Sequence, residues 1–409
     1  MSSKLVSKKT QRLVVSAQVR KPSILVLVMI LFVCFLTLPA CTSNVPALAS
    51  KPVETVTQAL VTQAPVLETP VFSQTPSKAA DIKTQEPAVN PLTGLAPDAP
   101  ELLDRRPIII KIENLPRNNR PQFGLNLADI VYEYHTEEGT TRFAAIFYGK
   151  HAEKVGPVRS ARWFDVQLIH MYKSIFIYGS AYQKLYDYLF DQDFSERLIL
   201  EGPYTYPALY RYEPAARNLL LVNTHLVNDV INAYKINNDR QDLSGMSFTD
   251  EINQGGDPAV NIYLRFSGAI YNRWDYDTQQ GVYLRFVDSQ DDINGTSEVY
   301  KQHVDGMSGE PITTDNLVML FSEYKEIDGP TITSPDLLGT GKAYVARNGF
   351  LLEAKWVRDN EDDIVKLVDN NGQPVNLKPG RTWYEILNTG SKVTVQAGGA
   401  WRFVFYMPK

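Results

Sequence analysis

The stretch ADIVYEYHTEEGTTRFAAIFY, residues 128–148, contains two apolar runs that are joined by a polar loop. Both runs are rich in β-branched and aromatic residues, which favour β-strands. The loop HTEEGT between them is polar, and its Gly139 allows the chain to turn tightly. This stretch therefore predicts two strands, at residues 128–134 and 141–148.

The residues on either side add more strands and the first helices. Residues 106–114, RPIIIKIEN, form a β-branched run typical of a buried strand. After Gly156-Pro157, apolar residues recur every three to four positions over residues 160–172, which predicts a helix. Further patterns predict a strand at 174–179 and helices at 182–190 and 224–234. Strands mixed with helices predict an α/β or α+β domain.

Beyond residue 256 the chain consists of short strand-like runs separated by turns such as Asn348-Gly349 and Asn371-Gly372. Asn-Gly between apolar runs is a strong signal for a β-hairpin. We therefore predict an α+β fold with two domains. A mixed α/β N-terminal domain at residues 90–255 is followed by a smaller, mostly antiparallel β C-terminal domain at residues 256–409.

The first 40 residues have the form of an export signal. Six basic residues precede an uncharged apolar run at residues 24–38, and Ala40 stands directly before Cys41. This pattern is typical of a bacterial lipoprotein signal, with residues 1–40 removed and Cys41 acylated. The protein would then be anchored in the lipid bilayer at the extracytoplasmic face of the cell membrane. An uncleaved transmembrane anchor is the alternative.

Residues 41–89 predict a disordered tether, because they are rich in Thr, Pro, Val, Ala and Gln and contain one aromatic residue, Phe72. The chain has two cysteines, Cys34 and Cys41, so the folded part has no disulfide and no cysteine metal site. Removing six basic residues with the signal leaves 35 Lys and Arg against 46 Asp and Glu, a formal charge of −11. A chain of this charge is not expected to bind nucleic acid, and any anion must be held by a local cluster.

Metal and cofactor sites are not predicted. The histidines show no paired spacing typical of a zinc site, and the chain has no P-loop and no G-x-S-x-G motif. The histidines are His135, His151, His170, His225 and His303.

The candidate site centres on VGPVRSARWFDVQL, residues 155–168, where Arg159, Ser160 and Arg162 stand at the expected start of a helix. Helix N-termini attract anions, and guanidinium groups match carboxylates and phosphates with two hydrogen bonds. The pattern is consistent with an oxyanion site. The alternatives are solvated arginines at a helix start, or structural salt bridges with Glu133 or Glu137.

The stretch RPQFGLNLADIVYEYHTEEGTTRFAAIFYGKHAEKVGPVRSAR, residues 120–162, resembles the signature of the YerB-like bacterial lipoproteins, a family defined by a domain of unknown function. Residues 339–387, from GTGKAYVARNG to RTWYEIL, resemble that family's C-terminal domain. The resemblance implies two domains and an anchored, extracytoplasmic protein, and it supplies no established reaction. The sequence departs from the family pattern at residues 177–181 and 214–219, where the pattern has histidines.

Three functions remain open. In the first, the protein binds an anionic envelope component, such as peptidoglycan peptides or a phosphate-bearing polymer, through Arg142, Arg159 and Arg162. Ser160 and Asn114 would add neutral hydrogen bonds. We expect the three arginines to face one concave surface with Glu133 at its edge.

The second possible function is an envelope glycan or phosphodiester hydrolase. Glu133 would pair with Glu137 or Glu138 as acid and base, and the arginines would stabilise a developing oxyanion. The third is a scaffold that binds cell-wall enzymes through exposed aromatic residues. The tryptophans that could carry such contacts, or could lie in the core, are Trp163, Trp274, Trp356, Trp383 and Trp401.

Overall fold

The computed structural model describes residues 88–251 and 255–406. The expected signal, Cys41 and the expected tether up to Pro87 lie outside these described residues. Within the described ranges, no helix has both the length and the apolar character needed to cross a membrane.

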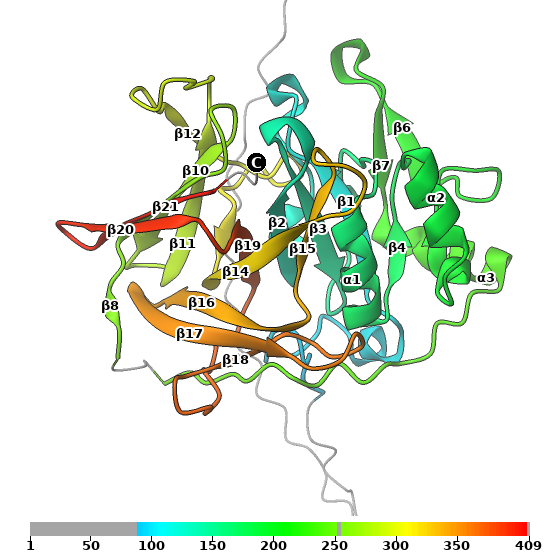
Figure 1. Cartoon of the computed structure of the whole chain (residues 1–409). Coiled ribbons are helices and arrows are strands. Elements are labelled where there is room, and N and C mark those ends of the chain that lie inside the picture. Colours follow the sequence, from blue (N-terminus) through cyan, green and yellow to red (C-terminus); the bar gives the residue numbers. More distant parts are fainter. Residues whose placement is uncertain (1–87, 252–254, 407–409) are drawn as a thin grey trace, which may run out of the picture. The chain divides into compact units, whose positions relative to one another are not determined.

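The largest element is a twelve-stranded mixed sheet, with strand order β18-β17-β16-β14-β19-β2-β3-β1-β4-β5 and with β15 and β8 paired to β14 and β17 (Figure 1). Its strands are β1 (Ile108–Glu113), β2 (Ile130–His135), β3 (Thr141–Phe147), β4 (Ile175–Ile177), β5 (Leu198–Ile199), β8 (Asp257–Pro258), β14 (Asn316–Glu326), β15 (Thr333–Asp336), β16 (Gly339–Arg347), β17 (Phe350–Arg358), β18 (Lys366–Val368) and β19 (Thr382–Asn388).

A second sheet has seven strands in the order β12-β11-β10-β9-β21-β20, with β13 paired to β11, and β6 and β7 form a separate hairpin. These strands are β6 (Leu209–Tyr212), β7 (Leu219–Val222), β9 (Asn261–Arg265), β10 (Tyr271–Asp277), β11 (Val282–Asp288), β12 (Tyr300–Gln302), β13 (Thr313–Thr314), β20 (Lys392–Gln396) and β21 (Ala400–Val404).

The α-helices of the described residues are α1 (Trp163–Tyr172), α2 (Gln183–Phe190) and α3 (Val227–Tyr234). Short 3-10 helices are η2 (Pro100–Asp104), η3 (Arg117–Asn119), η4 (Leu125–Leu127), η5 (Glu137–Gly139), η6 (Ser195–Arg197), η7 (Pro214–Ala216) and η8 (Thr224–Leu226). The described part of the chain is therefore mostly β, and the expected α+β fold is met only in part.

The position of β19 joins the two halves of the chain. β19 lies between β14 and β2 and is parallel to both, so a strand from near the C-terminus pairs directly with the first hairpin of the fold (Figure 1). The twelve-stranded sheet thus contains strands from both sides of residue 255. The two halves share one backbone hydrogen-bond network, and the division into domains at this residue stays a prediction.

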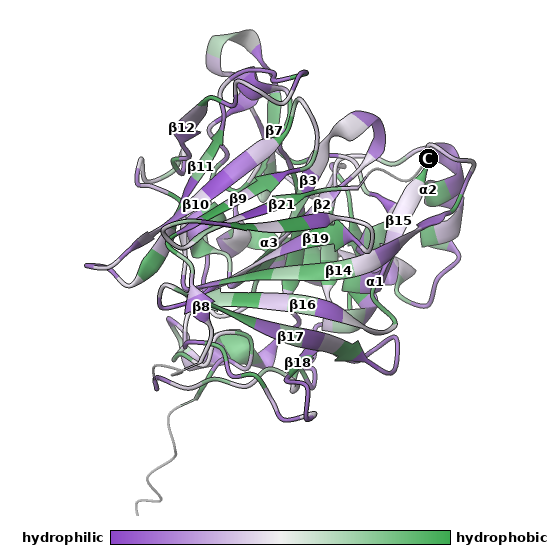
Figure 2. Cartoon of the chain, turned by 60° about the vertical axis from the view of Figure 1, so that its left-hand side comes forward, coloured by the Kyte–Doolittle hydropathy of each residue, from purple (hydrophilic) through white to green (hydrophobic). Residues whose placement is uncertain are grey.

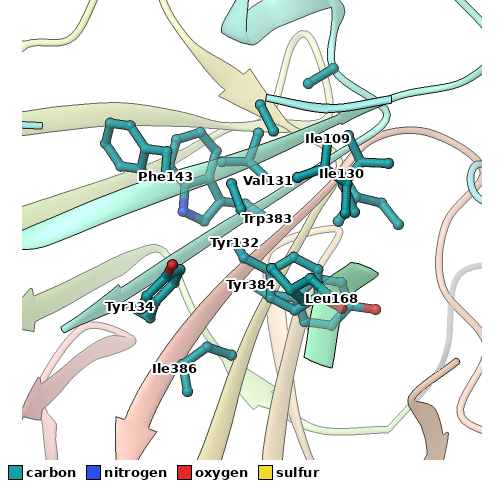
Figure 3. Close-up of a cluster of buried hydrophobic side chains, with 14 of the residues drawn as sticks. Ile109, Ile130, Val131, Tyr132, Tyr134, Phe143, Leu168, Trp383, Tyr384 and Ile386 are labelled. Atoms are coloured by element: carbon teal, nitrogen blue, oxygen red, sulfur yellow. The ribbon is translucent and has the colours of Figure 1, made fainter. Parts of the chain in front are cut away.

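The central strands of the twelve-stranded sheet are buried on both faces. On one face, Tyr132 stacks on Tyr384 with ring centroids 4.6 Å apart and contacts Phe164 of α1. On the other face, Trp383 contacts Phe143 and also Trp274 of the seven-stranded sheet. Figure 3 shows Tyr132 and Tyr384 on one side of these strands and Phe143 and Trp383 on the other. α1 therefore covers one face and the second sheet covers the other.

Apolar patterning explains which strands lie in the middle. Leu317 to Phe321 of β14 are all buried, and this part of the strand lies between β16 and β19. Figure 2 shows hydrophobic residues along this part of β14. Strands buried on both faces are expected to be continuously apolar rather than alternating. The more polar end of β14, from Glu323 to Glu326, pairs with the short strand β15.

Candidate functional site

Sheet pairing places Arg142 and Glu133 on opposite faces of the twelve-stranded sheet. Arg142 lies directly opposite Tyr134 of β2 and Glu113 of β1. Residues directly opposite in a sheet share a face, and successive residues of a strand alternate between faces. Glu133, which precedes Tyr134, therefore points to the other face. The expectation that Glu133 lies at the edge of the arginine surface is corrected by this alternation.

Arg142, Arg159 and Arg162, called the arginine cluster below, lie on the face covered by α1. The Arg159 guanidinium pairs with Glu113 at 3.0 Å, and that of Arg162 pairs with Glu137 at 2.6 Å. The Arg159 side chain is about half exposed (47%), and that of Arg162 is 20% exposed. Two arginines of the cluster thus form salt bridges, as the structural alternative expects. Glu137 was one of the expected partners, Glu113 was not, and Glu133 is not a partner of either arginine.

Arg142 differs from the other two arginines because it forms no ion pair within the described residues. It is 8% exposed, and its Nη1 donates a hydrogen bond to the backbone carbonyl of Thr141 at 3.0 Å. Its buried Nε has no hydrogen-bond partner there. Burial, together with the positive charges of Arg162 and Arg159, lowers the pKa of Arg142 to about 10. The guanidinium is still charged at neutral pH, and no carboxylate is bonded to it.

A buried ion pair that the sequence analysis missed lies beside the cluster. Lys111 of β1 pairs with Asp165 of α1 at 3.0 Å, and the Tyr134 hydroxyl donates to the same carboxylate. Burial lowers the pKa of Lys111 to about 7, with Arg162 and Arg142 adding to this effect against the opposing charge of Asp165. The signal was visible as a single lysine within the apolar run IIIKIE, residues 108–113.

Charged side chains of both signs lie around the cluster. Lys111, Arg159 and Arg162 each pair with one carboxylate, of Asp165, Glu113 and Glu137 respectively. Arg142 is the basic side chain of this group that has no carboxylate partner among the described residues.

α1 begins later than the sequence predicts, at Trp163 rather than near Ser160. The backbone N–H of Arg162, at the helix N-cap, donates to the Asp165 carboxylate at 2.7 Å. An acidic side chain of the helix itself therefore takes one of the N–H groups expected to hold a ligand. Ser160 precedes the helix, and its hydroxyl is 2.6 Å from that of Ser180.

The two segments that depart from the family pattern lie next to this site. In residues 177–181, the N–H of Gly179 donates to the carbonyl of Arg159 at 2.9 Å. In residues 214–219, Arg217 donates to the carbonyl of Asn118. Asn119 in turn donates to Glu113, the partner of Arg159, at 2.6 Å.

On the opposite face, Glu133 belongs to a buried polar network between the two sheets. It accepts hydrogen bonds from Asn114 and Thr141 at 3.1 Å and 2.7 Å, and it pairs with Arg285 of β11 at 2.5 Å. Asn114 is therefore also separated from the arginine cluster. Glu133 has no exposed surface. A fully buried and paired carboxylate is not placed to act as acid or base on an external substrate.

Arg159 and Arg162 reach the surface, whereas Arg142 is buried. Four hollows of the described residues are lined by other side chains. One of them, of about 740 Å³, contains the stacked rings of His151 and His225, whose centroids are 4.6 Å apart. No group of three or more potential metal-ligating side chains occurs within residues 88–251 and 255–406.

Comparison with known families gives two matches on this chain. The model described as "Protein of unknown function (DUF3048) N-terminal domain" matches residues 92–235. The corresponding C-terminal domain model matches residues 262–384. The first match contains the whole arginine cluster together with Glu113, Glu137 and Asp165.

One similar protein is "Putative lipoprotein YerB" of Bacillus subtilis (strain 168), which is 27% identical over 325 residues. The alignment covers 75% of this chain and 88% of the relative. The crystal structure of the YerB protein from Bacillus subtilis is similar in fold, with a TM-score of 0.62 and 24% identity over 73% of this chain and 96% of that chain.

Proposed function

This chain belongs to the YerB-like family of proteins of unknown function, and from that premise we propose that it is a lipid-anchored binding protein of the bacterial cell envelope. In this proposal the arginine cluster holds an anionic envelope component, and acylated Cys41 holds the protein at the extracytoplasmic face of the membrane. The basic region and apolar run before Cys41 support the anchor, as does the description of the Bacillus relative as a lipoprotein.

The observation that carries the proposal is the unmatched charge of Arg142. Burial of a guanidinium without a counter-ion is costly, and the neighbouring charges of Arg159 and Arg162 add repulsion. An anion bound beside all three arginines would offset both terms through charge-assisted hydrogen bonds. Such an anion would also compete with Glu113 and Glu137, which now pair with the two outer arginines.

A polymeric ligand could reach part of the cluster from solvent. The side chains of Arg159 and Arg162 are 47% and 20% exposed and could contact such a polymer directly, whereas Arg142 is 8% exposed and would act mainly through its charge. Peptidoglycan peptides present carboxylates, and other envelope polymers present phosphates. Guanidinium groups bind both with similar geometry. The acidic balance of the rest of the chain disfavours anions elsewhere, so the local cluster would account for specific binding.

The test is co-sedimentation of the full chain, in detergent, with purified cell walls that retain their anionic polymers. Each charge-assisted contact contributes about 1.5–3 kcal/mol, so Arg159→Gln/Arg162→Gln should weaken binding by roughly tenfold or more. Added salt should weaken wild-type binding as well.

The matched control is Arg240→Gln. Arg240 is also an exposed arginine paired with a carboxylate, Asp104, and it lies near Tyr148, which follows the far end of β3 from Arg142. The control should bind cell walls like the wild type. Equal sedimentation of the wild type and the Arg159→Gln/Arg162→Gln protein would refute the proposal.

A further inference from the structure

A group of aromatic side chains lies at the start of α1 and on α2. The ring of Trp163 is 4.8 Å from that of Tyr188 and 6.4 Å from that of Tyr182, with both pairs edge-on. The indole N–H of Trp163 donates to the Tyr182 hydroxyl. Trp163, Tyr182 and Tyr188 are called the aromatic patch below.

The patch is partly accessible. Tyr188 is 40% exposed, whereas Trp163 and Tyr182 are half-buried and pack against the core. The remaining tryptophans are at most 5% exposed: Trp274, Trp356, Trp383 and Trp401. Trp, Tyr and Arg carry much of the binding energy at recognition surfaces, so the exposed edge of the patch is a candidate contact surface.

The patch lies near the carboxylate partner of Arg162. Arg162 pairs with Glu137, and Trp163 directly follows Arg162 in the chain. Burial raises the pKa of the Tyr182 hydroxyl, and the nearby charges of Asp328 and Glu137 add to this rise. The hydroxyls of Ser160 and Ser180 meet at 2.6 Å on the same loops that carry Arg159 and lead to Tyr182.

This combination of groups matches one class of ligand. The C–H face of a sugar ring is apolar and packs against aromatic rings, while its hydroxyls exchange hydrogen bonds with serine side chains. An acid group on the same molecule would bind the arginines. A simple phosphate or a polyphosphate would leave the aromatic patch unused.

We infer that the ligand of the arginine cluster is an acidic carbohydrate, with its acid groups on Arg142, Arg159 and Arg162 and its sugar rings on the aromatic patch. The inference rests on the proposed function and narrows it to one chemical class. The acid groups have two possible sources in the envelope, carboxylates of peptidoglycan or phosphates of a glycosylated polymer.

The experiment measures affinity of the full chain, in detergent, for four soluble probes by isothermal titration calorimetry. Muropeptides carry sugars and carboxylates, and glycosylated wall teichoic acid carries sugars and phosphates. Polyphosphate is anionic without sugar, and chitotetraose is an uncharged sugar. We expect at least one acidic carbohydrate to bind more tightly than both polyphosphate and chitotetraose, and the probe that does so identifies the source of the acid group.

Two variants test the patch. Trp163→Phe keeps an apolar ring against the core but reduces its area, and Tyr188→Ala removes an exposed ring without opening the core. Each should weaken acidic-carbohydrate binding by about three- to tenfold and leave polyphosphate binding unchanged. The fluorescence of Trp163 can be obtained by subtracting the emission of Trp163→Phe from that of the wild type. It should change when the acidic carbohydrate binds. Tyr204→Ala is the control, because Tyr204 is exposed but packs against Tyr234 of α3.

The outcomes distinguish failure of the carbohydrate inference from failure of the proposed anion binding. If polyphosphate binds as tightly as the acidic carbohydrates, or if the patch variants bind them like the wild type, the carbohydrate inference is overturned while anion binding stands. If none of the anionic probes binds and cell-wall sedimentation is insensitive to Arg159→Gln/Arg162→Gln, both the inference and the proposed function fail.

Discussion

Glu133 and Glu385 are neighbouring buried carboxylates for which we predict unequal losses of stability from the same substitution. They lie directly side by side on β2 and β19, and neither has any exposed surface. Glu133 forms the ion pair with Arg285 at 2.5 Å. Glu385 accepts hydrogen bonds from Trp274 and Asn272, and burial together with the charge of Glu133 raises its pKa well above the usual range. Glu133 is thus the member of the pair that forms an ion pair, whereas the hydrogen-bond donors to Glu385 are neutral side chains.

Replacement of each glutamate by glutamine therefore removes an ion pair in one case only. Glu133→Gln takes away the carboxylate that pairs with buried Arg285, which should lower the free energy of unfolding by about 3–5 kcal/mol. Arg285 lies against Trp383, Trp274 and Phe143, and the neighbouring Glu385 forms no ion pair with it in the described residues. Glu385→Gln keeps a carbonyl acceptor for its two donors but places an amide N–H2 where the buried Oε2 has no partner, so it should cost about 1–3 kcal/mol.

The assay is urea denaturation of the full chain at pH 7, followed by tryptophan fluorescence, with the m-value compared between variants. The two substitutions are matched in chemistry, burial and position in the sheet, so the difference between them measures the contribution of the ion pair with Arg285. Equal losses of stability, or a larger loss for Glu385→Gln, would show that this ion pair does not dominate the stability of the network.

Two further predictions concern stability. Burial lowers the pKa of His135 to about 4, from an ordinary value of 6.5. Between these two pH values the imidazole is protonated in the unfolded chain but neutral in the folded chain. The free energy of unfolding should therefore fall by about 3 kcal/mol as the pH drops from 6.5 to 4. In His135→Phe the loss of unfolding free energy over this pH range should be smaller by the same amount. Urea titrations that give the same pH dependence of stability for the wild type and the variant would contradict this prediction. Gly139 has φ +70°, and an added Cβ would meet Ser267 at 3.0 Å, whereas Gly329 has φ +72° and open space around it. Both alanine substitutions carry the same backbone cost of about 1 kcal/mol, because both positions have a positive φ. Gly139→Ala adds the close contact with Ser267, so it should lower the thermal midpoint by more than Gly329→Ala. Equal shifts of the midpoint would show that the contact with Ser267 is unimportant.

Local patterns in the sequence predicted most of the individual elements around the site. The strands expected at residues 106–114, 128–134 and 141–148 are β1, β2 and β3, and the helix expected at 160–172 is α1. These assignments succeed because strand and helix periodicity depends on residues within a few positions of one another. The tight turn at Gly139 was likewise visible, since its positive φ favours glycine.

The central strand β19 was not predicted. Its sequence TWYEILN, residues 382–388, has Glu385 in the middle, which interrupts the apolar run expected of a buried strand. The glutamate is tolerated because Trp274 and Asn272, more than a hundred residues earlier in the chain, donate hydrogen bonds to it. Such partners cannot be identified from local sequence, and the strand that joins the two halves of the fold was therefore missed.

The sequence by itself determined which residues carry charge near the site and which elements present them, and it grouped Arg142, Arg159 and Arg162 as one candidate. Only the tertiary structure decided that Glu113 and Glu137 are the partners of the outer two arginines, and that Glu133 pairs with Arg285 on the other side of the sheet. The physical reason is that alternation along a strand is a local property. Which face is covered by α1, and which by the second sheet, depends on contacts between distant segments.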